Sequence, residues 1–193
     1  MTSKKKEKFS LILDAAQKVI AESGFHGAQV SRIAKEAGVA DGTIYLYFKN
    51  KEDILVSLFQ SRLGELVELF NARAMEAATS SEALRHICEI HFTQLERNAE
   101  LAYVTQIELR QSSLELRKAI GQAVKPYIEL IEHMVRRGME TGEFRADLDP
   151  KLTRLLLFGA MDEVVTSWLI SGRKYSLTAL VEPTVAFFLR GLR

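Results

Sequence analysis

The residues best suited to chemistry lie between positions 29 and 51, where hydroxyl side chains and lysines accompany two short apolar patterns. The first pattern ends at Ala37, and Gly38 allows the positive φ that a tight turn between two crossing helices requires. Ile44 and Phe48 are expected to anchor the second short helix. Hydroxyl groups at the start of such a helix suit base edges and phosphates in a DNA major groove. The hydroxyl residues on its exposed face are Thr43, Tyr45 and Tyr47.

Positive charge is concentrated in the same part of the chain. Residues 1–52 hold nine Lys and Arg against six Asp and Glu, although the whole chain is nearly balanced at 26 against 25. Lys49 and Lys51 flank the expected start of the next helix, where backbone amides and the helix dipole favour a phosphate. A basic end of this kind is typical of a nucleic-acid partner. A solvated tail has the same composition, so charge alone leaves both interpretations open.

Helical periodicity extends along almost the whole chain, and no strand-like alternation persists. Gly24 stands where a left-handed cap would end the first helix, and Asn50 where an N-cap would begin a long one. Asp149 is a cap followed by proline at the first helical position. We therefore expect an all-α fold of about nine helices. Further helices are expected to begin at Ser80 or Ser81 and at Ser113, with a break at Asn98 and a kink at Pro126. The last helix is expected to begin near Ser176, and Pro183 marks either a kink in it or its true first turn.

Two helical stretches are too apolar for the surface of a monomer. Residues 155–161 carry apolar side chains on all sides, and residues 185–192 are similar at the end of the chain, where helices usually fray. Either both stretches are buried within one chain, or they pack against the same helices of a second copy. The pattern favours the second copy.

Composition excludes several classes of protein. The chain has 193 residues, 47% of them hydrophobic, and a single cysteine, which excludes an internal disulfide framework and a cysteine-cluster metal site. The longest apolar run is residues 155–161, whereas a membrane span needs about 20 residues. The N-terminus carries lysines but no signal-peptide pattern. We expect a soluble, cytoplasmic protein without a metal or a cofactor.

The run from Gly38 to Lys51, GVADGTIYLYFKNK, resembles the TetR family of one-component transcriptional regulators. The likeness covers residues from about 10 to 57 and includes VSRIA before this run and KEDIL at its end. The resemblance implies a repressor in which residues 1–50 form the helix-turn-helix DNA-binding domain and residues 51–193 the effector-binding and dimerisation domain. It also implies a homodimer on palindromic double-stranded operator DNA, joined through its last two long helices.

Carried over by position, the resemblance assigns DNA contacts to the helix-turn-helix. Asp41 opens the recognition helix, and it departs from the Lys or small polar residue that many relatives have there. It could cap the helix, which we favour, or accept a hydrogen bond from a cytosine amino group. Tyr45 could instead be a half-buried packing residue. Ser31 and Thr43 would contact backbone or bases, Gly42 would open the helix beside Asp41, and Tyr45, Tyr47 and Lys51 would hold phosphates.

Residues 28–31, 40–55, 105–112 and 158–168 resemble one group of that family, the fatty-acid-degradation repressors of Gram-positive bacteria. This likeness implies a long-chain acyl-CoA effector that releases the operator. Such a ligand needs an apolar tunnel for its chain and cations for its phosphates. Candidate lining residues, about half of which should contact ligand, are Phe92, Leu95, Tyr103, Gln106, Leu109, Phe158, Met161, Val165 and Trp168. Candidate cations are Arg110, Arg117, Arg154, Arg173 and Lys174.

Two adjacent acids, Asp162 and Glu163, interrupt the apolar helix. A buried carboxylate is costly without a partner, so at least one should pair with an arginine or a hydroxyl. They would either form a structural ion pair or orient the pantetheine of the ligand.

Two other functions compete with this reading. An enzyme is not expected, because His86 and His91 are five residues apart, unlike an i, i+4 metal pair, and no phosphate loop or nucleophile pair is evident. A multidrug-type repressor of planar cationic compounds is the alternative within the same fold. It would recruit the aromatic and acidic side chains of Phe92, Asp162, Glu163 and Trp168.

Overall fold

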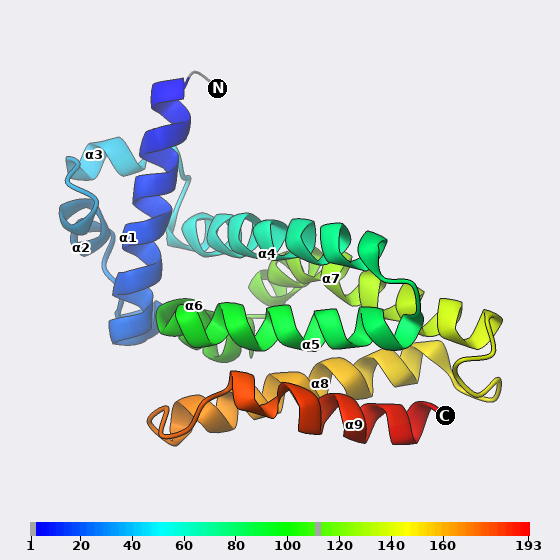
Figure 1. The fold of residues 1–193 in the computed structure, drawn as a ribbon. Helices are drawn as coiled ribbons and strands as arrows, with labels where there is room; N and C mark the ends of the chain where they lie inside the picture. Colours follow the sequence, from blue (N-terminus) through cyan, green and yellow to red (C-terminus); the bar gives the residue numbers. More distant parts are fainter. Residues whose placement is uncertain (1–2, 111–112) are drawn as a thin grey trace.

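The computed structural model describes residues 3–110 and 113–193, and their regular structure is helical throughout (Figure 1). Nine α-helices and two short 3-10 helices confirm the expected all-α fold within this range. Residues 111–112, which end the run at 105–112, and residues 1–2 lie outside the described residues. The elements are α1 (Ser3–Gly27), α2 (Val30–Glu36), α3 (Asp41–Ile44), α4 (Lys51–Glu76), α5 (Ser80–Arg97), α6 (Ala99–Ile107), η1 (Glu108–Arg110), α7 (Leu114–Glu140), α8 (Pro150–Ile170), η2 (Thr178–Leu180) and α9 (Val181–Leu192).

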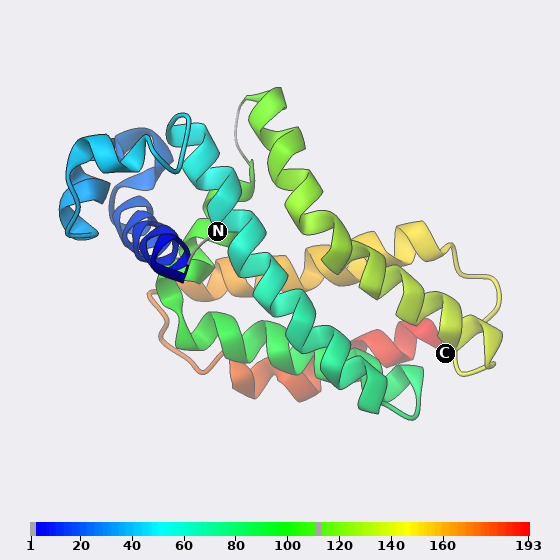
Figure 2. The same cartoon turned by 90° about the horizontal axis from the view of Figure 1, so that it is seen from above.

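Helices α1, α2 and α3 gather at one end of the molecule. Helices α2 and α3 lie against the outer side of α1, away from the body formed by the remaining helices (Figures 1 and 2). Gly24 has φ 68° and breaks α1 one turn before its end, while Gly38 has φ 66° between α2 and α3. Both glycines thus have the positive φ that the sequence predicts, although the ψ of Gly24, 162°, is extended and not that of a left-handed helical cap. A side chain with a Cβ would be strained at either turn.

The start of α3 differs from the favoured interpretation of Asp41. A capping residue has an extended backbone, and the extended residue here is Ala40, with φ −69° and ψ 147°. Asp41 is already the first helical residue, and the structure gives its side chain no capping hydrogen bond. The interpretation of Asp41 as the cap is therefore wrong. Its carboxylate still lies in the first turn, where the helix dipole favours negative charge.

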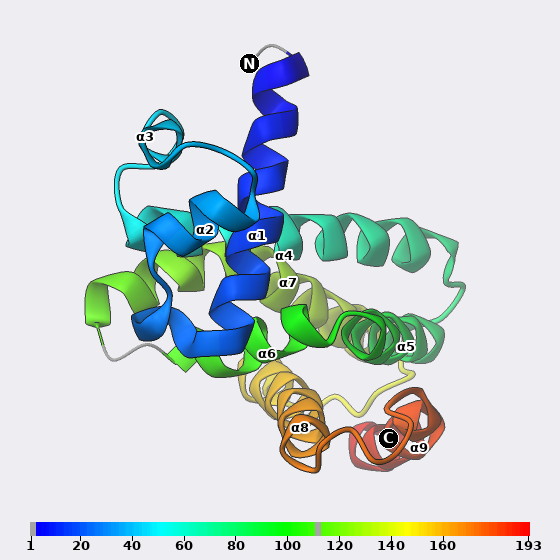
Figure 3. The same cartoon turned by 90° about the vertical axis from the view of Figure 1, so that its left-hand side faces the viewer.

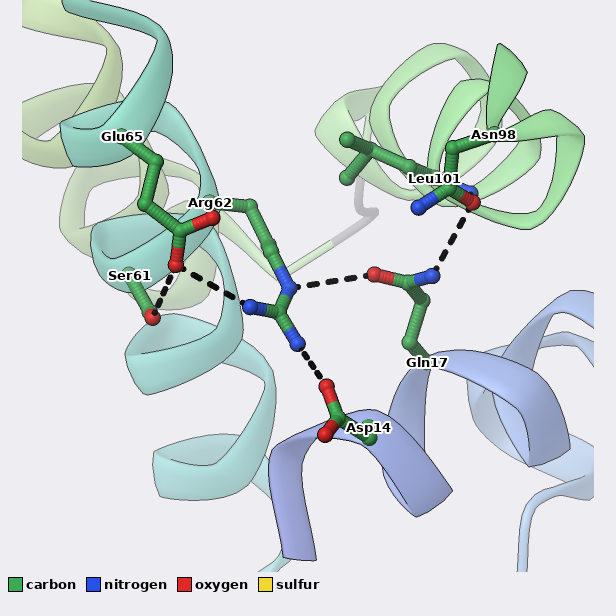
Figure 4. A network of polar contacts seen from close by, with 7 residues as sticks. All are labelled: Asp14, Gln17, Ser61, Arg62, Glu65, Asn98 and Leu101. Carbon is green, nitrogen blue, oxygen red and sulfur yellow. Dashed lines mark hydrogen bonds and ion pairs between the residues drawn. The ribbon is translucent and has the colours of Figure 1, made fainter. Parts of the chain in front are cut away.

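Helix α4 connects the three-helix end to the body. Arg62 of α4 forms an ion pair with Asp14 of α1 and donates to Gln17 Oε1 at 3.2 Å (Figure 4). Gln17 in turn donates to Asn98 Oδ1 at 3.1 Å, at the junction between α5 and α6. This network ties α1 to two separate parts of the body.

Most predicted caps are confirmed. Asn50, Ser113 and Asp149 accept hydrogen bonds from backbone amides in the first turns of α4, α7 and α8. Asn98 ends α5 and also caps α6, whose Leu101 amide donates to its side chain at 2.9 Å. The break between these two helices is thus encoded by one asparagine.

Two further boundaries resolve alternatives left open by the sequence. Helix α5 begins at Ser80. Helix α7 is continuous through Pro126, and the expected kink there stays a prediction. Pro183 lies in the true first turn of α9, which begins at Val181, and the chain at Ser176 is not yet helical.

Helices α8 and α9 lie side by side on the face of the body farthest from α3 (Figure 3). The side chains of Leu152, Leu155, Leu156 and Phe187 are 54%, 55%, 64% and 72% exposed. A groove of about 820 Å³ lies between the two helices and is mostly apolar. One chain therefore does not cover these side chains, and complete burial within the monomer is wrong for this face.

Candidate DNA-binding surface and effector cavity

The candidate DNA contacts lie on α2, on α3, at the start of α4 and in the connection between α3 and α4, which carries Tyr45, Tyr47 and Lys49. Ile44 and Phe48 are 1% and 2% exposed, which confirms that both are buried. Helix α3 ends at Ile44, so the expected helix carrying both residues is too long, and Phe48 lies after its end. Tyr45 is 59% exposed, so the alternative in which it packs half-buried is wrong. The exposed candidates are Ser31, Asp41, Gly42, Tyr45 and Lys49, and the half-buried ones are Thr43, Tyr47 and Lys51.

Lys51 is held against the end of α1. Its Nζ donates to the carbonyl oxygen of His26 at 3.1 Å and lies 4.7 Å from the centroid of the Phe25 ring, as in a cation–π contact. The backbone amide of Lys49 donates to Asp53 Oδ2 at 2.9 Å, so it is used within the first turn of α4. That amide is therefore not free to bind a phosphate.

A cavity of about 30 Å³ lies inside the body, between helices α4 to α8. This space holds about one water molecule, whereas pockets that enclose small ligands measure roughly 300–1,000 Å³. The predicted residues that line it are Leu95, Gln106, Leu109, Phe158 and Asp162. The lining residues that the sequence did not predict are Phe59, Leu63, Leu66, His91, Thr105, Val124 and Tyr127.

The other predicted lining residues are not brought to this cavity. Phe92, Met161 and Val165 are fully buried in the surrounding core. Trp168 donates from Nε1 to the carbonyl oxygen of Tyr175 at 2.9 Å, near the end of α8, and Tyr103 is half-buried on α6. Helical periodicity identifies inward-facing side chains, but the packing of five helices decides which of them surround the cavity.

Asp162 is the charged group of the cavity lining, and it is 2% exposed. Its Oδ2 accepts from Arg110 Nη2 at 2.5 Å, which confirms that one of the two adjacent acids pairs with an arginine. Burial raises the pKa of Asp162, while the hydrogen bond and charge of Arg110 and a hydrogen bond from Gln106 oppose that rise. Glu163 is exposed and accepts from the Ser167 hydroxyl at 3.0 Å. Arg110 thus holds a buried carboxylate while more than half of its own side chain faces solvent.

The remaining candidate cations are spread over the surface. Arg154 Nε lies 2.8 Å from Glu132 Oε2, in an ion pair between α8 and α7. Arg117 is exposed on the first turns of α7. Arg173 and Lys174 are exposed in the turn after α8, where Arg173 has φ 60°. Of the five, the structure brings Arg110 to the cavity.

His91 and Tyr127 meet in the cavity lining. Tyr127 Oη is 3.2 Å from His91 Nδ1, and the two rings are stacked with an interplanar angle of 13°. Burial lowers the pKa of His91 to about 4 and raises that of Tyr127 well above its usual value. Both groups are therefore neutral at pH 7. His86 points elsewhere, toward the carbonyl oxygen of Arg73, so the two histidines do not meet.

A second polar contact joins the cavity region to the DNA-binding end. Glu108 lies in η1 between Leu109 of the cavity and the last turn of α6, and it is 5% exposed. Its Oε1 accepts from the backbone amide of Phe25 at 2.8 Å. Phe25 also carries Lys51 on its ring. A short chain of contacts thus runs from the cavity wall to a candidate phosphate contact.

The three-helix end with its exposed hydroxyls, joined to a helical body that encloses an apolar cavity, defines a one-component regulator. Residues 12–58 match the family model of bacterial regulatory proteins of the tetR family, and residues 59–191 match that of the YsiA-like protein C-terminal region. The chain belongs to the TetR family of transcriptional regulators. Within the described residues, no helix has the length and apolar character needed to cross a membrane.

Fatty-acid regulators stand among the most similar relatives. The fatty acid metabolism regulator protein of Bacillus subtilis is 46% identical over 97% of each chain. The structure of the fatty acid degradation regulator FadR from Bacillus halodurans is 50% identical, with a TM-score of 0.93, over 96% of this chain and 100% of that one. FadR from Bacillus subtilis in complex with stearoyl-CoA is 46% identical, with the same TM-score and coverage. These relatives are transcriptional regulators, and this chain is a regulator rather than an enzyme.

Proposed function

We propose that this chain represses genes of fatty-acid degradation and that long-chain acyl-CoA releases it from its operator. The observation that carries the proposal is the nearly full-length similarity to a regulator whose structure contains stearoyl-CoA. The apolar cavity in the body supports it, because Leu95, Leu109 and Phe158 offer a surface for a hydrocarbon chain. A regulator that binds chromosomal DNA would act in the cytoplasm.

Ligand entry must enlarge the cavity. A volume of about 30 Å³ cannot hold a long acyl chain, so the chain would wedge α5, α7 and α8 apart and shift α4. Helix α4 joins residues 1–50, the proposed DNA-binding domain, to residues 51–193, the proposed effector-binding and dimerisation domain. A shift of α4 would move the recognition helices away from the spacing of roughly 34–36 Å that adjacent half-sites require.

The proposed assembly is a homodimer on a palindromic operator. The exposed apolar face of α8 and α9 supports it, because large apolar patches on a folded chain mark surfaces that bind another protein. A self-complementary contact of these two helices would place the same surface on both copies. Two helix-turn-helix units would then face the two halves of the palindrome.

Among the candidate cations, Arg110 is the one we assign to the ligand phosphates or to the groups next to them. Its guanidinium lies at the cavity edge and already bonds Asp162 and the carbonyl oxygen of Gln106. Arg117 is exposed and close to Arg110 in the sequence, and we assign to it a second contact with the ligand phosphates or the groups next to them. Arg154 is committed to Glu132 in an ion pair, which makes it a weaker choice.

The test is gel retardation of a promoter fragment, titrated with palmitoyl-CoA, free palmitate and free CoA. We expect release by the thioester alone, because binding needs both the hydrocarbon chain and the charged head group. Retention of the fragment with all three compounds would overturn the proposed effector and leave the DNA-binding assignment standing.

A multidrug-type repressor is the second candidate, since a buried acid in an apolar cavity could bind a cationic compound. Asp162 argues against it, because Arg110 already neutralises that carboxylate and a cation would have to displace the guanidinium. Competition between a planar cationic dye and palmitoyl-CoA separates the cases. If the dye both displaces bound palmitoyl-CoA and releases the DNA, the hypothesis of a multidrug-type repressor is favoured.

The DNA-binding surface predicts the behaviour of two substitutions. Thr43→Ala and Lys51→Ala should each lower operator affinity about tenfold, because each removes a contact to the duplex. Lys51→Ala should also reduce the slope of log affinity against log salt by about one, as loss of a phosphate contact requires. Anisotropy titrations at several salt concentrations measure both quantities.

The matched control is Lys118→Ala, which removes an exposed lysine of α7 in the body. It should leave affinity and salt slope unchanged. All three variants should keep the mass of the wild-type assembly in solution. Normal operator affinity in both Thr43→Ala and Lys51→Ala would refute the assigned DNA contacts.

A further inference from the structure

The cavity lining contains several polar side chains, and one buried polar atom among them, His91 Nε2, lacks a hydrogen-bond partner among the described residues. Thr105 donates to the carbonyl oxygen of Leu101 at 2.9 Å, Gln106 accepts from Thr166, and Asp162 is paired with Arg110. An unmet polar atom in an apolar surrounding is costly, so native structures normally supply a partner.

The protonation of His91 and Tyr127 fixes what the pair can offer. The pKa of His91 is lowered to about 4 and that of Tyr127 is raised, so at pH 7 each neutral group carries one polar hydrogen. One of these two hydrogens makes the bond between Tyr127 Oη and His91 Nδ1. If the hydroxyl donates, the second hydrogen is on Nε2; if Nδ1 donates, it stays on the hydroxyl. In both tautomers the pair retains one donor hydrogen that this bond does not use.

The surrounding rings hold this donor in place. Tyr127 stacks on Phe70 with a centroid distance of 4.6 Å and an interplanar angle of 9°. The Phe158 ring packs edge-on to Tyr127, with a centroid distance of 5.9 Å and an interplanar angle of 73°. His91 itself is 6% exposed. A donor whose position is fixed before the ligand arrives can select a ligand that carries an acceptor at one definite place.

We propose that the His91–Tyr127 pair donates a hydrogen bond to the thioester carbonyl oxygen of acyl-CoA and so favours the thioester over a ligand without that oxygen. This inference rests on the proposed function. A saturated acyl chain carries no acceptor atom, and the carbonyl oxygen is the acceptor directly attached to it. The chain would occupy the apolar lining, while Arg110 would meet the head group on the solvent side.

The test compares two ligands that differ in that oxygen alone: palmitoyl-CoA and S-hexadecyl-CoA, a thioether in which a CH₂ group replaces the carbonyl. Titration calorimetry on the full-length protein measures both affinities. The wild-type protein should prefer the thioester about tenfold, the effect of one hydrogen bond in an apolar site. His91→Phe should reduce this preference to less than about twofold.

Two further variants separate recognition from packing. His91→Gln keeps an N–H donor and should retain most of the preference. Leu95→Met alters the cavity wall one turn along α5 without changing a donor, so it should shift both affinities together and leave their ratio unchanged. Should His91→Phe fail to fold, as thermal unfolding would reveal, His91→Leu provides the same comparison with a smaller side chain.

The outcomes separate a failure of this inference from a failure of the proposed function. If the wild-type protein binds both ligands equally, or if His91→Phe weakens both by the same factor, the pair has a structural role and this inference is overturned while the proposed function stands. If the wild-type protein binds neither ligand, the proposed effector is wrong, and the inference falls with it.

Discussion

If the proposed homodimer forms through α8 and α9, Leu156→Glu is expected to convert it into monomers and to lower operator affinity at least a hundredfold. Leu156 is 64% exposed in one chain and lines the groove between α8 and α9. Burying a leucine side chain at an interface contributes about 1.5–3 kcal/mol, and an unpaired buried carboxylate adds a penalty of several kcal/mol. A two-fold interface contains each substituted residue twice, so the effect is doubled. A monomer contacts one half-site and loses the gain from binding both.

Sedimentation equilibrium gives the mass, and gel retardation gives the operator affinity. The matched control is Leu69→Glu, because Leu69 is 44% exposed on α4, outside the groove. It should leave the dimer and the operator complex unchanged. Circular dichroism confirms that both variants stay helical. A Leu156→Glu protein that remains dimeric at micromolar concentration would show that another surface joins the two copies.

The DNA-binding end could be predicted from sequence because its pattern is local. Gly38 marks the turn and the i, i+4 pair Ile44 and Phe48 sets the buried face, so the exposure of Tyr45 follows from neighbours a few residues away. Asp41 shows the limit of this reasoning. A shift of one residue at the start of α3 moves it from the cap into the helix, and helix ends are the least certain feature of a sequence.

The cavity could be predicted only in part because it is made by contacts far apart in the chain. His91 and Tyr127 both follow apolar stripes, yet nothing in either stripe indicates that they meet 36 residues apart. Glu108 is a stronger case, since a charged side chain in a helix normally faces water. Here it is buried against the amide of Phe25, 83 residues away, which sequence periodicity does not encode.

Glu108→Ala is expected to uncouple the effector from the operator. In the wild-type protein we expect palmitoyl-CoA to weaken operator binding by a factor within the 5- to 150-fold range of typical allosteric couplings. Glu108 is the contact between η1 at the cavity and Phe25, whose ring carries Lys51. Without the carboxylate, movement of η1 no longer pulls on this part of α1. The factor should fall to about threefold or less, while both ligands still bind alone.

The measurement is the operator affinity with and without palmitoyl-CoA, and the palmitoyl-CoA affinity with and without operator. Linkage requires the two factors to agree in every variant. Glu108→Gln is the matched control, because its amide oxygen can still accept from the Phe25 amide and should preserve most of the coupling. Full coupling in Glu108→Ala would instead favour the other connection to α1, in which Arg62 of α4 bonds Asp14 and Gln17 (Figure 4). In that case Arg62→Ala should uncouple the sites, because α4 rather than η1 would transmit the shift.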